Sequence, residues 1–395
     1  MKIDRFLIEK RAIWLIFFSA FLLRLLFVIL VPLDAGDTPE YDDYALNLLG
    51  GFGFSANIKR PPLYPLLLTF IYFFFGHNFL AVRIVQAILD AITCVLVYLL
   101  GKKIFQNKKT AFFGASLAVV NPSLIASTSY ILTETLTAFL LTSSMFILVK
   151  AWEEKRKRDW TVSGILLGLS TLTRPVTLLF PLFFGVKLFC SSKKKFAPAL
   201  FISLFCLGMV LPISPWTVRN AIVFHKFIPV TTDAGYNLWV GSYLPWDGDY
   251  NWKDLSDMKN LVKGLSPIEA DKKFFSEAMK NIRQNPGAYV FLCFRKSGRF
   301  WLQIPGGRRV LENSLSAKIL IFILQYFLLF LAVLGIRSAF QEKNPFVFIP
   351  ILMITYFTLT HIFLLAIPRY HIPVLPLVAV IAGRGAIHCA RKERA

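Results

Sequence analysis

Charged residues and cysteines are both scarce in this chain. Only 17% of its 395 residues are Asp, Glu, Lys or Arg, whereas 56% are hydrophobic, a balance that excludes a disordered protein and an ordinary soluble enzyme. The five cysteines are widely scattered, without a C-x-x-C pair or the Cys/His spacing of a zinc site, so neither a disulfide scaffold nor a cysteine-based metal site is expected. The sequence also lacks a Walker-type phosphate loop, which argues against an ATP-driven pump. An integral membrane protein is the class that remains.

Acidic residues are outnumbered by basic ones, 23 against 44, which gives a net charge of +21. Most of this excess lies in short clusters between apolar runs, which is typical of membrane topology and does not indicate nucleic acid as a partner. A helix needs about 20 apolar residues to cross the ~30 Å hydrocarbon core of a bilayer. Ten segments approach this length: residues 12–33, 80–101, 110–128, 134–151, 160–173, 174–190, 196–216, 317–336, 345–366 and 373–390.

An eleventh apolar run, residues 61–76, is shorter and contains three prolines. If this run does not cross the membrane, every basic cluster of the chain faces the cytoplasm, as the positive-inside rule requires. We therefore expect 61–76 to lie in the outer interface, both termini to be cytoplasmic, and the protein to reside in the plasma (inner) membrane. The clusters that decide this topology are residues 2–11, 102–109, 155–158, 193–195, 337–343 and 391–394.

This topology divides the chain into three parts. Residues 1–216 are expected to form an N-terminal transmembrane module that includes an external loop at 34–79. Residues 217–316 form an external (periplasmic) domain, and residues 317–395 form the C-terminal transmembrane helices. The expected fold class is an all-α polytopic membrane protein of about ten spans with a small external domain that contains helices.

The middle of the external domain predicts two consecutive helices. Ser266 precedes Pro267 and Glu269 in the pattern of a helix N-cap. Pro286 and Gly287 then interrupt the helical pattern before a second helix begins.

The densest acidic cluster lies in the first external loop. If Asp37 opens a helix that ends near Gly50, then Asp37, Glu40, Tyr41 and Tyr44 share one face of it. Such a face suits a chemical role for the acids. The alternative is structural, because Asp37-Thr-Pro-Glu40 is also a capping box, and the two interpretations are compatible.

A second feature is Arg60, which stands immediately before paired prolines and Tyr64, where the chain re-enters the interface. A guanidinium fixed in this way can bind a phosphate bidentately. The alternative is an interfacial arginine that contacts lipid head groups.

Several motifs together resemble a known class of enzymes. The segment D-T-P-E-Y-x-x-Y-A-x-N-L-L-x-G-x-G-F-S, followed by R-P-P-L-Y-P, is similar to the start of the bacterial GT-C glycosyltransferases related to protein O-mannosyltransferases and aminoarabinose transferases (families 39 and 83). The segments TSYILTETLT, GLSTLTRP, PWTVRNAIVFHKFIPVTTDAGYNLWVGS and PRYHIPVLPLVAVIAG agree with this class. The likeness covers most of residues 12–390, although 245–316 matches little.

The resemblance implies a fold and an activity. The fold would be a transmembrane bundle whose first external loop forms two juxtamembrane helices, and the activity would be inverting transfer of a sugar from a polyprenyl-phosphate carrier. By position, Asp37 matches the general base and Arg60 the group that meets the carrier phosphate. This chemistry needs one carboxylate to remove the acceptor proton and positive groups to stabilise the departing phosphate. Tyr41 and Tyr64 would supply supporting contacts.

Further basic residues are predicted at the outer boundary, where they could hold the departing phosphate. For each of them, contact with lipid head groups is the alternative. These donor-side candidates are Arg174, Arg219 and the Arg369-Tyr370-His371 cluster.

Glu134 begins the fourth span, at the outer surface, where the resembled class carries a second acid. It would bind the acceptor, together with Glu40 and Tyr41, or share a divalent cation such as Mg²⁺ or Mn²⁺ with Asp37. The alternative is that it compensates the helix dipole. His225 and His361 are expected to be interfacial or packed, not metal ligands, and no cofactor is certain.

Arg24 and Asp90 lie at similar depth in their predicted spans. An isolated charge at that depth is costly, so we expect a structural ion pair between them in preference to a carrier-phosphate role for Arg24.

Two rival functions follow from the same sequence. One is a polysaccharide polymerase or ligase that uses a diphosphate-linked carrier, and the other is a lipid-linked sugar flippase. A flippase should show paired, inverted halves with broken helices near mid-membrane, which the sequence does not display clearly. Membrane lipids and a polyprenyl-phosphate sugar are the expected partners, whereas the sequence does not identify the sugar or the acceptor.

Overall fold

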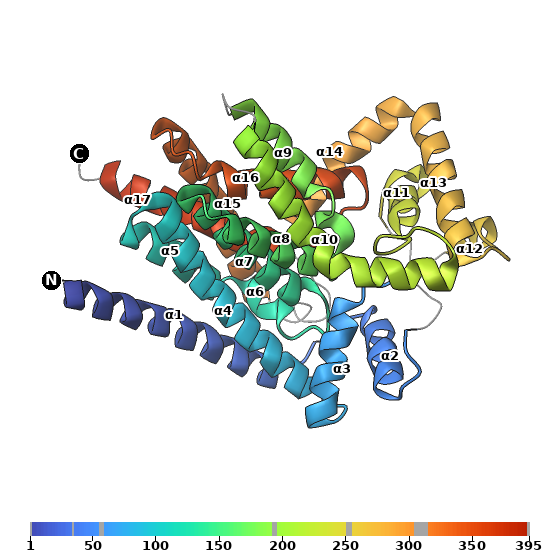
Figure 1. The fold of residues 1–395 in the computed structure, drawn as a ribbon, viewed down its shortest axis with the longest axis horizontal. Helices are drawn as coiled ribbons and strands as arrows, with labels where there is room; N and C mark the ends of the chain where they lie inside the picture. Colours follow the sequence, from blue (N-terminus) through green and yellow to red (C-terminus); the bar gives the residue numbers. More distant parts are fainter. Residues whose placement is uncertain are drawn as a thin grey trace.

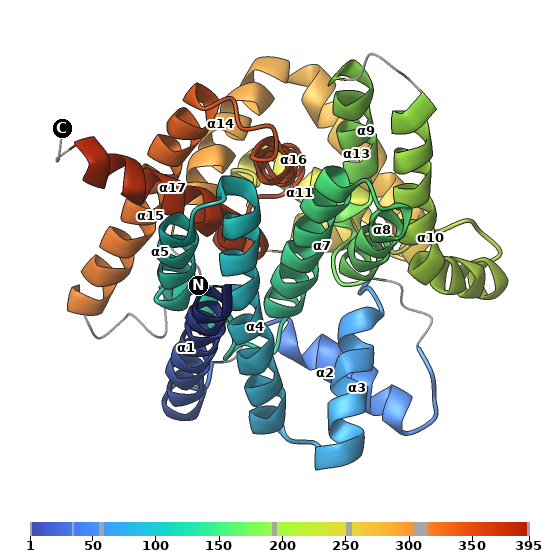
Figure 2. The ribbon, with the colours of Figure 1, turned by 60° about the vertical axis from the view of Figure 1, so that its left-hand side comes forward.

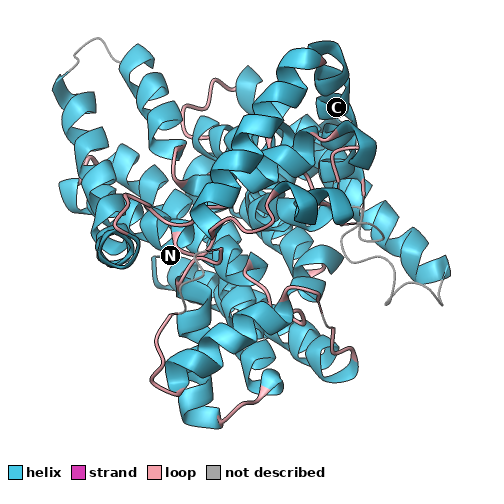
Figure 3. Ribbon diagram, turned by 90° about the vertical axis from the view of Figure 1, so that its right-hand side faces the viewer, coloured by secondary structure: helices cyan, strands magenta, loops and turns pink. Residues whose placement is uncertain are grey.

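A computed structural model describes residues 2–33, 35–54, 59–191, 196–249, 255–303 and 315–392, and over these ranges the chain is helical, without a strand (Figures 1 and 3). Helices suit an apolar chain in a bilayer because each satisfies its own backbone hydrogen bonds. The longer helices of the first half are α1 (Lys2–Leu30), α2 (Thr38–Leu49), α3 (Leu63–Phe75), α4 (Phe79–Phe105), α5 (Lys108–Val119), α7 (Glu134–Glu154), α8 (Lys157–Thr171) and α9 (Phe180–Ser191). Those of the second half are α10 (Phe196–Phe224), α11 (Ala234–Ser242), α13 (Pro267–Gln284), α14 (Pro286–Leu302), α15 (Leu315–Gln341), α16 (Phe348–Phe363) and α17 (Leu375–Lys392). The short pieces are α6 (Pro122–Ser127), α12 (Ser256–Leu261), η1 (Pro175–Thr177), η2 (Leu244–Trp246) and η3 (Pro368–Val374).

Fewer helices are long enough to cross a bilayer than the sequence predicts. Each of the ten expected segments is largely helical, but four of them contain helices of 12 to 16 residues, which measure about 18–24 Å at 1.5 Å per residue. These are α5, α8, α9 and α16. The count of about ten spans is therefore not confirmed. Six helices in the described part of the chain meet the length and apolarity of a span: Glu9–Leu30, Phe79–Phe105, Glu134–Glu154, Pro198–Phe224, Lys318–Gln341 and Pro368–Ala390.

The expected span 110–128 is broken into two helices. α5 ends at Val119, and Asn121 caps the next helix, α6, by accepting a hydrogen bond from Leu124 N at 3.0 Å. Asn121 also precedes Pro122, and the residue before a proline disfavours helical geometry. The hydropathy of the run hides this break because both pieces are apolar.

A buried arginine caps the carbonyl end of α5. Arg24 of α1 donates hydrogen bonds to Ala118 O at 3.0 Å and Val119 O at 2.8 Å, in the last turn of α5. Its Nε also donates to Asp90 of α4, and both side chains are fully buried. The Arg24–Asp90 ion pair expected from the sequence is therefore present, and it also supplies hydrogen bonds to a helix end that has no intrahelical partner.

The two chain ends lie together at one end of the molecule, and α2, α3 and the helices α11 to α13 lie toward the other (Figure 1). α3 runs beside α2 (Figure 2), and its 13 residues extend only about 20 Å. Its inner face buries Tyr64, Leu68 and Tyr72 against α2, while Phe70 and Phe73 are more than 60% exposed. This matches an interfacial helix, which places aromatic side chains at the level of the lipid head groups.

α8 and α10 pack backbone to backbone. A Cβ atom on Gly164 or Gly168 of α8 would collide with the backbone of α10, and glycines at this spacing allow the closest approach of two membrane helices. α10 continues beyond the expected end of its span at residue 216 to Phe224, with Pro212 and Pro215 inside it. The expected boundary between the membrane module and the external domain therefore falls inside a helix.

The helices α11 and α13, with the short η2, share a core of their own. Ser266 and Glu269 form the predicted capping box of α13, and α14 begins at Pro286. The core of these helices extends to the segment after α16, and its buried members are Trp239, Val240, Trp246, Phe274, Ala278 and Leu365.

Candidate active site

The central group of the candidate site is the carboxylate of Asp37, just before α2. Its position would allow it to cap the helix, yet its side chain makes no capping hydrogen bond. Its Oδ1 accepts a hydrogen bond from Arg60 Nη2 at 2.9 Å, and its Oδ2 accepts one from Arg369 Nη2. The expected capping role is therefore wrong, because two guanidinium groups hold the carboxylate away from the amides of α2.

Asp37 stays ionised in this setting. Burial alone would raise the pKa of its carboxyl group, but the guanidinium groups of Arg369 and Arg60 outweigh that effect and hold the pKa below its usual range. The side chain of Asp37 is 24% exposed, so a ligand can reach it. With both oxygens engaged, Asp37 is a weak base.

Arg60 connects the acidic face of α2 to the start of α3. Its Nε donates to Glu40 at 2.6 Å, and its guanidinium lies 5.0 Å from the ring centre of Tyr41. Three of the four residues that the helical spacing predicted on one face, Asp37, Glu40 and Tyr41, thus meet this one arginine. Asp37 and Glu40 hold the guanidinium of Arg60 in place, and the ring of Tyr41 lies at its flat side. This arrangement suits a planar guanidinium.

Glu134 begins α7 and is only 3% exposed. Its Oε1 lies 3.6 Å from Arg174 Nη1 and 3.6 Å from Arg369 Nε, which is too long for hydrogen bonds but close enough for ion pairs. Arg174 stacks on Tyr370 at 4.5 Å. Three atoms at this junction, Glu134 Oε2, Arg174 Nη1 and Arg369 Nε, are buried without a hydrogen-bond partner. A bound polar group would satisfy them.

Gln86 of α4 supports this cluster and was not predicted from the sequence. It is fully buried, and its Oε1 accepts a hydrogen bond from Tyr64 OH at 2.9 Å while its Nε2 donates to Thr128 O and Tyr130 O at 3.0 and 2.8 Å. Tyr64 in turn meets the Tyr41 ring edge-on at 5.2 Å. Gln86 therefore joins the arginine side of the site to the segment that leads into Glu134. The only sequence feature that could have indicated this role is a polar glutamine inside a predicted membrane span.

Arg219 lies at a different point from the other expected donor-side residues. Its Nη2 donates to Phe54 O at 2.9 Å, and its guanidinium packs on Trp216 at 5.0 Å and Phe224 at 5.3 Å. These contacts hold Phe54 against α10.

The acids of the site are paired with arginines. Arg369 pairs with both Asp37 and Glu134, so a positive group already occupies the position between the two carboxylates that a shared Mg²⁺ or Mn²⁺ would need. Within the described ranges, no three His, Cys, Asp or Glu side chains are grouped to hold a metal ion. His361 is buried with Nδ1 2.7 Å from Phe357 O, as a packed histidine would be.

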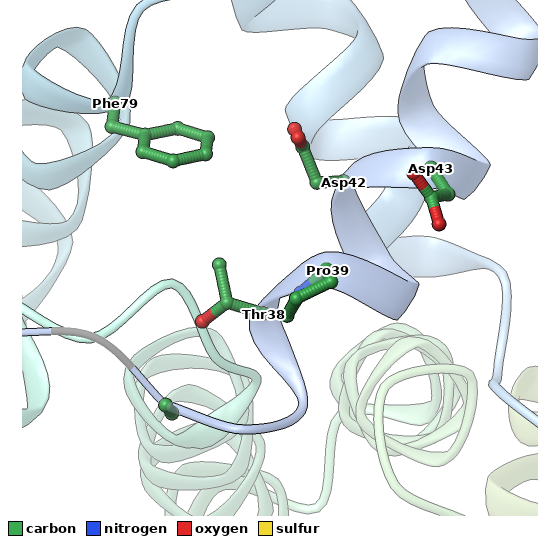
Figure 4. Close-up of a pocket in the computed structure, with 6 residues that line it drawn as sticks. Thr38, Pro39, Asp42, Asp43 and Phe79 are labelled. Carbon is green, nitrogen blue, oxygen red and sulfur yellow. The ribbon is translucent and has the colours of Figure 1, made fainter.

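α2 also borders a pocket on its opposite face (Figure 4). Thr38 and Asp42 project about 100–140° around the helix from Asp37, so this pocket is separate from the arginine cluster. Asp42 accepts a hydrogen bond from Tyr72 OH at 2.7 Å and pairs with His77 at 2.9 Å. The pocket encloses about 300 Å³ and is lined by Ala35, Thr38, Pro39, Asp42, Asp43 and Phe79.

Within the described ranges the fold is an all-helical bundle with six helices long and apolar enough to cross a membrane, and a cluster of acids and arginines lies where α2, α3, α7 and η3 meet. Residues 59–216 match the family model described as dolichyl-phosphate-mannose-protein mannosyltransferase. The resemblance to GT-C glycosyltransferases that the sequence motifs indicated is thereby confirmed. The matched range includes Arg60, Glu134 and Arg174, whereas Asp37 and Arg369 lie outside it.

Solved structures of an archaeal oligosaccharyltransferase share this fold at low sequence identity. The archaeal oligosaccharyltransferase AglB from Archaeoglobus fulgidus, in complex with an inhibitory peptide and a dolichol-phosphate, superposes with a TM-score of 0.59 at 14% identity over 98% of this chain and 51% of that protein. ArnT from Cupriavidus metallidurans bound to undecaprenyl phosphate gives a TM-score of 0.46 at 11% identity over 97% of this chain and 78% of that one. The chain therefore spans about half the length of AglB.

A curated relative matches a shorter stretch. An uncharacterised protein of Aquifex aeolicus (strain VF5) is 27% identical over 149 residues, which are 36% of this chain and 30% of that protein.

Proposed function

We propose that this protein is an inverting glycosyltransferase that moves a sugar from a polyprenyl-phosphate carrier to an acceptor at the extracytoplasmic face of the membrane. The observation that carries the proposal is the carboxylate of Asp37 held between Arg60 and Arg369, from opposite ends of the chain. A base beside two phosphate-binding groups is what this transfer needs. The family match over residues 59–216 and the fold shared with a dolichol-phosphate complex support the same class.

The orientation of the site is part of the proposal. The cluster of arginines and acids lies where α2, α3, α7 and η3 meet, toward the end of the molecule away from the two termini (Figure 1). Lys102 and Lys103 lie in the last turn of α4, where Lys103 pairs with Glu153 at 2.5 Å. The positive-inside rule then places the termini in the cytoplasm and the site outside.

The carrier phosphate would change the partners of Asp37. A phosphate could accept from Arg60 and Arg369 the hydrogen bonds, one from each arginine, that the carboxylate of Asp37 now receives. Once the arginines turn to the phosphate, the pKa of Asp37 rises toward its usual range, because burial is then less opposed by positive charge. Binding of the donor would therefore convert a weak base into a stronger one, only when a leaving group is in place.

The steps of the transfer follow from these positions. The carboxylate of Asp37 accepts the proton of the acceptor hydroxyl or amine, whose heteroatom attacks the anomeric carbon while the bond from that carbon to the phosphate oxygen breaks. The leaving phosphate keeps the bonding electrons, and the guanidinium groups of Arg60 and Arg369 stabilise its charge. Glu134, with an oxygen that has no hydrogen-bond partner, would accept a hydrogen bond from the acceptor.

A comparison of donors tests this function. The purified protein in lipid nanodiscs is offered a panel of synthetic polyprenyl-monophosphate sugars and the matching diphosphate-linked sugars, and release of the free carrier is measured. Turnover of a monophosphate donor that is lost in Asp37→Asn supports the proposal. Turnover of diphosphate donors alone would instead favour the polymerase or ligase, and donor movement across the bilayer without cleavage would favour a flippase.

A further inference from the structure

A buried lysine of α14 connects this helix to the carbonyl ends of α11 and α16. Lys296 of α14 is fully buried, and its ammonium group donates hydrogen bonds to Gly241 O at 2.8 Å and to Leu364 O at 3.1 Å. Gly241 lies in the last turn of α11, and Leu364 is the residue that ends α16. Burying a charge is costly, and here the partners are backbone carbonyl groups, so the site around Lys296 is built for a cation.

Helix geometry explains why a cation fits there. The carbonyl ends of α11 and α16 converge on one point, and each helix end carries a partial negative charge with carbonyls that lack intrahelical partners. Burial lowers the pKa of Lys296 to about 8; Cys293 opposes this effect, and the positive charge of Arg299 adds to it. The ring of Tyr289 lies 5.1 Å from the ammonium nitrogen. At neutral pH the group is still mostly charged, so it satisfies both helix ends.

The segment after α16 is fixed at several further points. Tyr289 OH donates to Phe363 O at 2.6 Å. A Cβ atom on Gly241 would collide with the carbonyl of Leu364, so α11 presses directly on this backbone. Leu365 is buried in the core that α11 and α13 share. Residues 363–367 therefore have little freedom to move relative to α11 and α14.

This same segment leads directly into η3, which begins at Pro368 and carries Arg369. Arg369 is the group that reaches Asp37 and Glu134. We infer that Lys296 is a positioning residue: it fixes the segment 364–367 against α11 and α14, and so sets where the guanidinium of Arg369 stands relative to Asp37. If the proposed function holds, the packing of α11 and α14 on this segment then determines how well the carrier phosphate is held.

Hydrogen–deuterium exchange tests this role without any substrate. Lys296→Met keeps the length of the side chain but removes the donor, and we expect amide exchange over residues 363–371 to rise at least tenfold, with α13 unchanged. Lys280→Met, the same change at an exposed lysine of α13, should leave that segment as in the wild type. Gly241→Ala is a second variant that displaces Leu364 without removing a charge, and it covers the case in which Lys296→Met fails to fold. Unchanged exchange over 363–371 in a folded variant would overturn the inference.

A binding experiment tests the path through Arg369. We expect Lys296→Met to weaken binding of undecaprenyl phosphate about tenfold in the wild-type background and to cause no further loss in the Arg369→Gln background. Equal losses in both backgrounds would mean that Lys296 does not act through Arg369. If the wild type fails to bind undecaprenyl phosphate, the proposed function fails, whereas the exchange measurement still decides the role of Lys296.

Discussion

Replacing Asp37 with Asn should separate catalysis from carrier binding. The substitution keeps the shape of the side chain but removes its charge and its ability to accept a proton. Loss of a general base typically lowers a rate by about 10²- to 10⁴-fold, so transfer should fall into this range or below detection. Carrier binding should change in the opposite direction, because Arg60 and Arg369 lose the acid that competes with the phosphate for them.

The size of the gain in binding can be worked from the geometry. Two unit charges about 4 Å apart attract by about 4 kcal/mol at an effective dielectric constant near 20. Asp37 is 24% exposed, and its two partners are 23% and 26% exposed, so solvent screens a large part of this attraction. A remaining effect of roughly 1–2 kcal/mol corresponds to an affinity for undecaprenyl phosphate that is about 5- to 30-fold tighter.

The assay pairs two measurements on the same nanodisc preparation. Release of free carrier from a polyprenyl-phosphate sugar reports transfer, and titration with undecaprenyl phosphate reports binding. Asp43→Asn is the matched control, because Asp43 is exposed on the opposite face of α2. Carrier binding that weakens in Asp37→Asn would refute the competition between carboxylate and phosphate, and retained turnover would remove Asp37 as the base.

Three further outcomes concern stability. Arg24→Met should lower the free energy of unfolding by about 3–5 kcal/mol because it leaves Asp90 charged and buried. Scanning fluorimetry measures this loss of stability. A second substitution in the same protein, Asp90→Leu, should recover most of it. Gly168→Leu should lower the melting temperature because α8 and α10 would have to separate, whereas Gly287→Leu, at an open position, should not. The ion pairs of Asp37, whose pKa is lower in the folded state, stabilise the fold above a pH of about 4 and are lost below it. The difference in melting temperature between the wild type and Asp37→Asn should therefore shrink between pH 7 and pH 3.

The sequence predicted which residues would gather because membrane topology constrains position so strongly. Once the basic clusters are assigned to one face, Arg60, Glu134, Arg174 and Arg369 all fall at the opposite ends of their helices, and a bundle brings such ends together. The contacts at Asp37 and Glu134 show that these ends do meet. The helical secondary structure could also be predicted from the sequence, because a long apolar run in a bilayer has few structural alternatives to a helix.

Other features depend on tertiary contacts that no local pattern contains. Asp37 has the sequence of a helix cap, but Arg369, 332 residues away, competes for it. Gln86 and Lys296 lie in ordinary helical segments, and their roles arise only where other segments of the chain bring backbone carbonyl groups to them. The break after α5 was missed because hydropathy measures apolarity and does not register a capping side chain such as Asn121.

The distance along the chain between the partners of Asp37 also constrains biosynthesis. The ribosome makes Asp37 and Arg60 before Arg369, which follows Asp37 by 332 residues. Until then the nascent protein carries the acid with one arginine, and the junction with Glu134 is incomplete. The cluster of acids and arginines is therefore complete only after Arg369 has been made, so a product terminated before Arg369 would enter the membrane with Asp37 and Glu134 lacking one of their shared partners.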